Sequence, residues 1–230
     1  MAKHDAEARQ EKGVQSIEGA LSTTEQFIER NRKWMLLAVL ALVVVVSGYL
    51  AYRHFVAMPR EEQAQNQIYP AQQQFEKDSF AVALNGDGNN LGFLQVMEEY
   101  SSTRTANLAR YYAGICYREL GEWDKAIEML KSYRTSDEMV APVAMGALGD
   151  CYMEKGETDK ALDYYTRAAS YVKNRLTTPI FLMKRAMVLE QKGAWGDALA
   201  AYETVRRDYP SSTQARTVEK FIARAKARMQ

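Results

Sequence analysis

The chain has 230 residues, enough for one domain of ordinary size with an appended segment. Its formal net charge is +1 and 26% of its residues are charged, so no overall charge imbalance indicates nucleic acid as a partner. Two cysteines, Cys116 and Cys151, are too few for a disulfide scaffold, and no C-x-x-C or His/Cys cluster indicates a zinc site. The two histidines, His4 and His54, lie upstream of the repeats described below, which excludes histidine-based catalysis there.

Residues 1–33 are predicted to form an amphipathic stub. Val14, Ile17, Leu21 and Ile28 follow one another at helical spacing, with charged residues between them. Two interpretations remain open for this stub. It is either a helix that binds an interface or a partner, or a solvated tail that carries a few apolar residues.

Residues 34–55 are predicted to form a transmembrane helix. No residue from Trp34 to Tyr52 is charged, and at about 1.5 Å per residue this stretch spans roughly 28 Å, close to the ~30 Å hydrocarbon core of a bilayer. A buried helix of a soluble protein fits less well, because the apolar residues cover all faces. A cleaved signal peptide also fits less well, because the stretch begins far from Met1, is long, and lacks a small-x-small exit.

The basic residues around this span predict its orientation. Arg30, Arg32 and Lys33 lie directly before it, and the basic residues after it are sparser. The positive-inside rule therefore places the N-terminus in the cytoplasm and the rest of the chain on the far side of the membrane, which in a bacterium is the periplasm.

Residues 60–103 are interpreted as a linker helix and a degenerate first repeat. Pro70 predicts a kink or a restart of the helix. The sequence NGDGNN at 85–90 predicts a loop, and 91–100 resembles the second helix of a repeat.

Three similar phrases recur later in the chain: GEWDKAI at 121–127, GETDKAL at 156–162 and GAWGDAL at 193–199. Their first glycines lie 35 and 37 residues apart, a period typical of helix–turn–helix repeats. Glycine is expected to end the first helix of each pair in a left-handed conformation. Small residues that let paired helices approach, and large residues that fill the gaps beside them, recur in phase: Gly114 with Leu130, Gly149 with Tyr165, and Ala186 with Tyr202.

This pattern over 107–210 resembles three tetratricopeptide repeats. The resemblance implies an all-α solenoid of helix pairs that follows the transmembrane helix. The segment 211–230 is predicted to be the capping helix of this solenoid. Its outer face is basic and carries Lys220, Arg224, Lys226 and Arg228.

In that family the concave groove is lined mainly by four positions of each first helix. Carried onto this sequence, the groove residues are Leu108, Tyr111, Ile115, Arg118, Val143, Gly146, Asp150, Met153, Ile180, Met183, Met187 and Glu190. The set is mostly apolar and rich in methionine, which suits apolar or unfolded peptide segments. Glutamates in place of Met183 and Met187 are expected to abolish binding and leave the fold intact. The alternative is that the chain's own N-terminal unit or capping helix covers these residues.

Cys116 and Cys151 occupy equivalent positions on successive first helices. Neighbouring helix axes lie about 8–10 Å apart, so a disulfide is possible only with a favourable offset. Buried free thiols that fill small spaces are the preferred interpretation.

The order of stub, apolar span and repeats resembles the ancillary subunit family of the bacterial SecYEG protein-secretion translocon. Members of that family are single-pass inner-membrane proteins with a periplasmic tetratricopeptide domain. The resemblance implies a non-enzymatic adaptor without cofactors, whose partners are translocon subunits, exported polypeptides or periplasmic chaperones. The alternative is a structural scaffold for another envelope-assembly complex. Nothing in the sequence resembles a nucleophile–base pair, a phosphate loop or a metal site.

Overall fold

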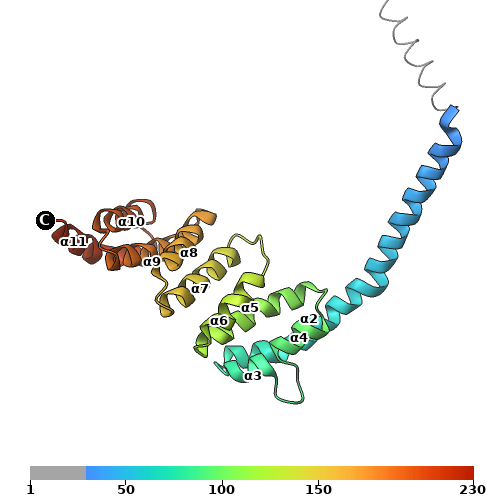
Figure 1. The fold of residues 1–230 in the computed structure, drawn as a ribbon, viewed down its shortest axis with the longest axis horizontal. Helices are drawn as coiled ribbons and strands as arrows, with labels where there is room; N and C mark the ends of the chain where they lie inside the picture. Colours follow the sequence, from blue (N-terminus) through green and yellow to red (C-terminus); the bar gives the residue numbers. More distant parts are fainter. Residues whose placement is uncertain (1–29) are drawn as a thin grey trace, which may run out of the picture. The chain divides into compact units, whose positions relative to one another are not determined.

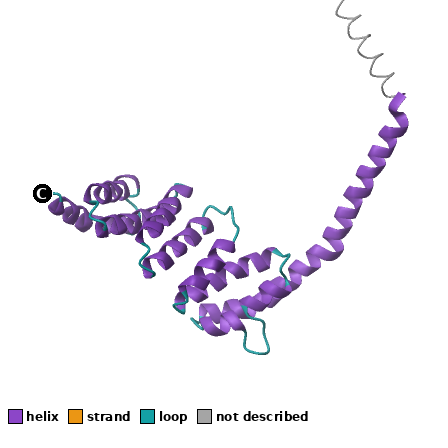
Figure 2. Cartoon of the chain, in the orientation of Figure 1, coloured by secondary structure: helices purple, strands orange, loops and turns teal. Residues whose placement is uncertain are grey.

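The computed structural model describes residues 30–230. Positions 1–29 of the predicted stub lie outside the described residues. The chain divides into two units, Met1–Pro59 and Arg60–Gln230. Every regular element over residues 30–230 is helical, and this part of the chain has no strand (Figure 1, Figure 2). The predicted all-α fold is therefore confirmed.

The described part of the first unit is an apolar helix. Residues 30–52 are α-helical and are followed by the π-helix η1, Arg53–Ala57. Among the described residues, Arg30–Glu76 is the one helical stretch long and apolar enough to cross a membrane. Its large apolar side chains, such as Trp34 and Leu42, are exposed rather than packed in a core. Exposed apolar side chains on all faces are the arrangement that a bilayer accommodates.

The second unit begins with a long helix and two short ones: α2, Met58–Glu76; α3, Phe80–Asn85; and α4, Phe93–Glu99. Helix α2 continues through Pro70, where the sequence predicted a kink or a restart. Buried Ala64, Ile68 and Ala71 hold α2 in place on both sides of the proline in sequence. Packing therefore outweighs the hydrogen bond that proline removes.

A loop separates α3 from α4, as the sequence predicted. Its Asp87 carboxylate accepts hydrogen bonds from the backbone N–H groups of Asn89 (2.9 Å) and Asn90 (2.7 Å). Helix α4 is shorter than the predicted helix, because Leu91 and Gly92 precede its first turn.

Six helices form three consecutive pairs: α5, Arg104–Glu119; α6, Trp123–Ser132; α7, Val140–Glu154; α8, Thr158–Tyr171; α9, Thr177–Gln191; and α10, Trp195–Asp208. The members of each pair pack against each other, and each pair packs against the next through α6 with α7 and α8 with α9. Figure 1 shows these pairs following one another along the unit.

The three repeat glycines end the first helices as predicted. Gly121, Gly156 and Gly193 have φ values of 77°, 72° and 73°. The N–H of Glu122 then reaches back to the carbonyl of Tyr117 at 2.8 Å, and the two later turns repeat this bond. This pattern is the Schellman cap, which satisfies carbonyls that the helix end leaves open.

Small residues allow the paired helices to approach closely. A Cβ added to Gly114 would lie 2.6 Å from Cγ of Leu130, and one added to Gly149 would lie 2.5 Å from Cε1 of Tyr165. The alanine at the sixth position of each phrase is fully buried: Ala126, Ala161 and Ala198. The core thus runs continuously along the helix pairs.

Helix α6 departs from the repeat. It has 10 residues, whereas α8 and α10 have 14 each. After it, residues 133–137 belong to no helix, and the Asn107 side chain holds this segment by donating to the Arg134 carbonyl (2.7 Å) and accepting from the Arg134 N–H (3.0 Å).

The chain ends with the 3₁₀ turn η2, Gln214–Arg216, and the helix α11, Val218–Arg228. The capping helix predicted over 211–230 therefore starts only at Val218. Ser212 forms a turn before it, because its hydroxyl donates to the Tyr209 carbonyl (2.8 Å) and accepts from the Ala215 N–H (3.1 Å).

Candidate partner-binding surface

The predicted groove residues lie on the first helix of each pair. Helix α5 carries Leu108, Tyr111, Ile115 and Arg118; α7 carries Val143, Gly146, Asp150 and Met153; and α9 carries Ile180, Met183, Met187 and Glu190. They differ widely in exposure, which the repeat phase alone does not indicate.

Two of the predicted apolar residues are buried. Ile115 and Met183 belong to the core, and Met183 is only 6% exposed. A glutamate at Met183 would therefore place an unpaired charge among apolar side chains, which is costly. The expectation that this substitution leaves the fold intact is incompatible with that burial.

Three of the other predicted apolar residues of α7 and α9 are exposed, whereas Met153 is half-buried. Val143, Ile180 and Met187 are exposed, and so are Met139 and Leu176, which directly precede the two helices. Helices α7 and α9 are in contact with each other. We call these five residues the apolar face.

Sequence reasoning missed Met139 and Leu176, although Leu176 is 65% exposed. Each lies four residues before a predicted groove residue, Val143 or Ile180, and residues four apart share one side of a helix. That spacing was the available signal. The repeat pattern did not reveal it, because both residues lie at the caps.

The charged residues in the middle of the predicted groove bind one another. The Asp150 carboxylate accepts a hydrogen bond from the Tyr165 hydroxyl (2.6 Å), pairs with Lys184, and lies 3.5 Å from Nη1 of Arg118. Burial and the hydrogen bond to Asp150 raise the pKa of Tyr165, so its hydroxyl remains a donor. These groups line a cleft of about 370 Å³ together with Met153.

The capping helix covers one end of the predicted groove. Arg224 of α11 donates from Nε to Oε1 of Glu190 (3.2 Å) and pairs through Nη2 with Oε2. The Glu190 side chain is only 9% exposed as a result. The alternative of coverage by the chain itself therefore holds at Glu190, whereas Met187 on the same helix is 39% exposed.

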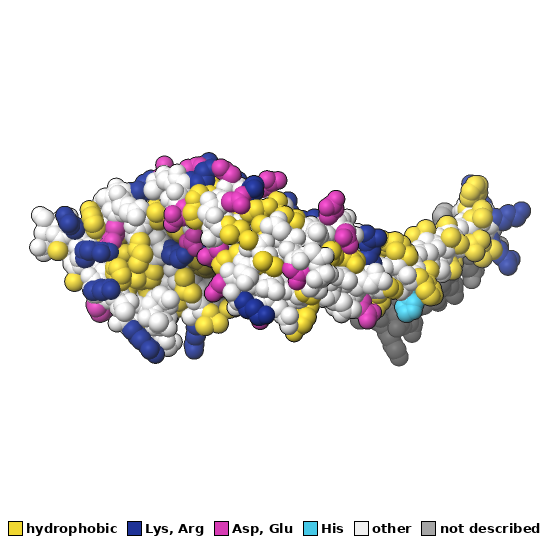
Figure 3. Space-filling model, turned by 90° about the horizontal axis from the view of Figure 1, so that it is seen from below, with side chains coloured by type: hydrophobic (Ala, Val, Ile, Leu, Met, Phe, Trp, Pro, Cys, Tyr) yellow, Lys and Arg dark blue, Asp and Glu magenta, His cyan; other side chains and the backbone are white. Residues whose placement is uncertain are grey.

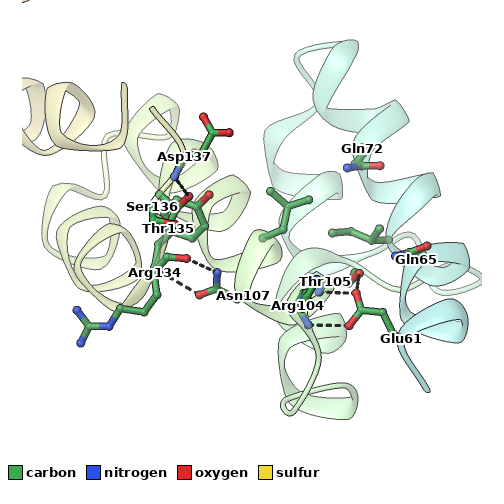
Figure 4. Close-up of a pocket in the computed structure, with 13 residues that line it drawn as sticks. Glu61, Gln65, Gln72, Arg104, Thr105, Asn107, Arg134, Thr135, Ser136 and Asp137 are labelled. Carbon is green, nitrogen blue, oxygen red and sulfur yellow. Dashed lines mark hydrogen bonds between the residues drawn. The ribbon is translucent and has the colours of Figure 1, made fainter. Parts of the chain in front are cut away.

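The N-terminal helices leave the other end open. Leu108 lines a hollow of about 1140 Å³ between α2 and residues 133–137 (Figure 4). Glu61, Gln65 and Gln72 form the α2 wall of this hollow.

Glu61 fixes α2 to the start of α5. Its carboxylate accepts from the N–H groups of Arg104 (2.7 Å) and Thr105 (3.0 Å) and from the Thr105 hydroxyl (2.7 Å). Burial acts to raise the pKa of Glu61, but these hydrogen bonds outweigh it and lower the pKa.

The basic side chains of α11 lie against aromatic rings. Nζ of Lys220 is 4.9 Å and Cζ of Arg224 is 5.0 Å from the ring centre of Phe221. Figure 3 shows dark-blue basic side chains around yellow hydrophobic ones at this C-terminal end. Lys220 and Arg224 of the predicted basic outer face thus make cation–π contacts, whereas Lys226 lies 3.5 Å from the Glu203 carboxylate.

No group of three or more His, Cys, Asp or Glu residues that could hold a metal ion occurs in the described part of the chain. Cys116 and Cys151 are free and buried. Burial raises their pKa values to about 12 and about 11, so the reactive thiolate form is scarce at neutral pH.

Comparison with known families agrees with the helix pairs. A tetratricopeptide repeat model matches residues 114–175 and 147–213. No curated protein matches the sequence. Together with the left-handed glycines and the close-packed pairs, this match shows that the chain carries tetratricopeptide repeats, a fold that typically serves protein–protein interaction.

Proposed function

We propose that the chain is a membrane-anchored adaptor of the protein-secretion translocon, and that its apolar face contacts apolar segments of exported polypeptides. In this proposal residues 1–33 lie in the cytoplasm, 34–55 cross the bacterial inner membrane, and 60–103 link the span to three periplasmic repeats over 107–210 capped by 211–230. Periplasmic chaperones or translocon subunits are further partners.

The observation that carries the proposal is the apolar face itself. It presents Met139, Val143, Leu176, Ile180 and Met187 on two neighbouring helices, and the capping helix leaves Met187 exposed. Exposed apolar side chains that gather on neighbouring helices are a feature of protein-binding sites. Two methionines adapt their shape to different side chains, which suits a variable client.

The membrane span supports the location of this surface. The helix over residues 30–52 has no charge after Lys33, and Arg30, Arg32 and Lys33 lie at its start. An adaptor held at the bilayer meets chains as they leave a channel. The high effective concentration then compensates for weak individual contacts.

The test is crosslinking to a secretory chain stalled in transit, with the full-length adaptor in inner-membrane vesicles. We expect a photo-crosslinker at Val143 to capture the stalled chain, and Ile180→Glu with Met187→Glu to abolish this product. The matched control is Val82→Glu with Leu120→Glu, since Val82 (37%) and Leu120 (41%) are about as exposed as Ile180 (36%) and Met187 (39%) but lie outside the apolar face.

Equal crosslinking by the face variant and the control would refute the client contact. Capture of a fixed set of envelope-assembly proteins without channel subunits would favour the scaffold instead.

A further inference from the structure

The early end of α6 leaves a further pocket, on another side of α7. Its volume is about 350 Å³. It is lined by Leu130, Lys131, Tyr133, Arg134, Thr135, Ala141, Ala144, Met145, Leu148, Tyr164 and Arg167. None of these residues belongs to the apolar face.

The rim of this pocket is basic. Lys131, Arg134 and Arg167 line it, and no acidic residue does. The Arg134 side chain forms no ion pair within the described part of the chain, and Arg167 pairs only with exposed Asp163 at 3.7 Å. In a chain with 30 basic and 29 acidic residues, this is a local excess of positive charge.

Two cations of this rim are held against tyrosine rings. Nζ of Lys131 lies 5.5 Å from the ring centre of Tyr152, and Cζ of Arg167 lies 5.0 Å from that of Tyr164. The two rings stack with centres 5.4 Å apart. Stacking positions the cations and leaves them without a carboxylate in the pocket.

The floor of the pocket is apolar. Leu130, Ala144 and Leu148 are buried beneath it, and Met145 and Tyr164 are half-buried. An apolar floor with a few polar groups at the rim is the usual composition of a ligand-binding pocket, and this floor suits a bulky apolar group.

One wall offers unpaired backbone. Tyr133 is extended, with φ −66° and ψ 134°, and residues 133–137 belong to no helix or strand. The backbone N–H and C=O of Thr135 form no hydrogen bond within the described residues, whereas those of the preceding residue, Arg134, bond to Asn107. A second extended chain can pair with such groups, while a lipid chain cannot.

We propose that this pocket binds an extended segment of a partner protein, with a bulky apolar residue on the floor and flanking Asp or Glu residues at the basic rim. This site goes beyond the proposed client contact, because it lies between α6, α7 and α8 and selects acidic flanks. Like charges would exclude segments with basic flanks.

The test uses the full-length chain in detergent and a fluorescein-labelled EEFEE peptide, followed by fluorescence polarisation. Lys131→Gln with Arg167→Gln should weaken binding about ten-fold, because two exposed charge pairs are lost. Lys125→Gln with Lys160→Gln removes the same charge outside the pocket and should leave binding unchanged. Peptides QQFQQ and EEGEE, which lack the acidic flanks or the apolar anchor, should bind about ten-fold more weakly or not at all.

Equal loss in the pocket variant and in the control variant would overturn the proposal, since it would indicate non-specific attraction. Displacement of the peptide by dihexanoyl phosphatidylglycerol, with the same dependence on Lys131 and Arg167, would overturn it in favour of a lipid headgroup. Ile180→Glu with Met187→Glu should not change EEFEE binding, so failure of this site and failure of the apolar face are separable.

Discussion

Replacing Asp150 by alanine is expected to destabilise the repeats more than any other single charge removal on α7. The carboxylate is a common partner for Tyr165 on α8, Lys184 on α9 and Arg118 on α5. It therefore links the middle helix pair to the first helix of each of the other two pairs. The substitution leaves the buried Tyr165 hydroxyl without its acceptor. A hydrogen bond to a charged group contributes about 1.5–3 kcal/mol, and we expect a loss of about 2–3 kcal/mol.

The measurement is thermal and urea unfolding followed by circular dichroism. For a unit of this size 1 kcal/mol corresponds to about 2–4 °C, so the midpoint should fall by roughly 4–12 °C. Asp163→Ala is the control, because the ion pair between Asp163 and Arg167 is exposed and long, at 3.7 Å. Its midpoint should stay close to that of the parent chain.

A double-mutant cycle with Tyr165→Phe separates the hydrogen bond from the ion pairs. The two substitutions should be less than additive, because both remove the 2.6 Å bond between the hydroxyl and the carboxylate. Strict additivity, or equal midpoints for Asp150→Ala and Asp163→Ala, would refute the role assigned to Asp150.

Three further outcomes follow from local geometry. Gly156→Ala should lower the free energy of unfolding in urea by about 1–2 kcal/mol. The cause is its φ of 72°, since no atom lies near enough to clash with the added Cβ. Gly196→Ala inside α10 should instead stabilise the chain, and equal effects of the two substitutions would contradict this backbone argument. Cys116 and Cys151, with pKa values of about 12 and about 11, should react with Ellman's reagent at pH 8 only after unfolding; rapid reaction of the native chain would contradict their burial. Because the folded-state pKa of Glu61 is lowered, its stabilisation is present above the unfolded value of about 4.3 and is lost as pH falls through the folded value. The urea midpoints of the parent chain and Glu61→Gln should therefore converge as pH falls below about 4.3, and a constant difference would contradict this.

The helix pairs were predictable because their determinants are local. A left-handed turn at Gly121, Gly156 and Gly193 favours one residue type, and the fully buried alanines follow at a fixed distance. Three copies in phase then fix the register of every helix between them. The sequence therefore specifies which helix carries each predicted groove residue.

Exposure was not predictable in the same way. Met183 and Met187 are the same residue type on the same helix, yet one is buried and the other is not. The exposure of a side chain depends on how closely the neighbouring helices approach. One such approach is that of Phe181 on α9 to Gly146 on α7, which has no side chain to keep the ring away. The pairing of Glu190 with Arg224 likewise joins residues far apart in sequence. The sequence alone does not reveal these contacts, so it cannot tell which residues on one face of a helix are buried and which are exposed.

The short α6 is the clearest case where a weak fit to the repeat carries information. Helix α6 ends at Ser132, directly before Tyr133, after only 10 residues. The non-helical segment that follows it lies between the hollow beside Leu108 and the basic pocket, because Tyr133, Arg134 and Thr135 line both. Regular helices of 14 residues at α8 and α10 occupy the corresponding positions in the later pairs. Regular repeats build the core of this array, and departures from the repeat supply the recesses in which a partner can be recognised.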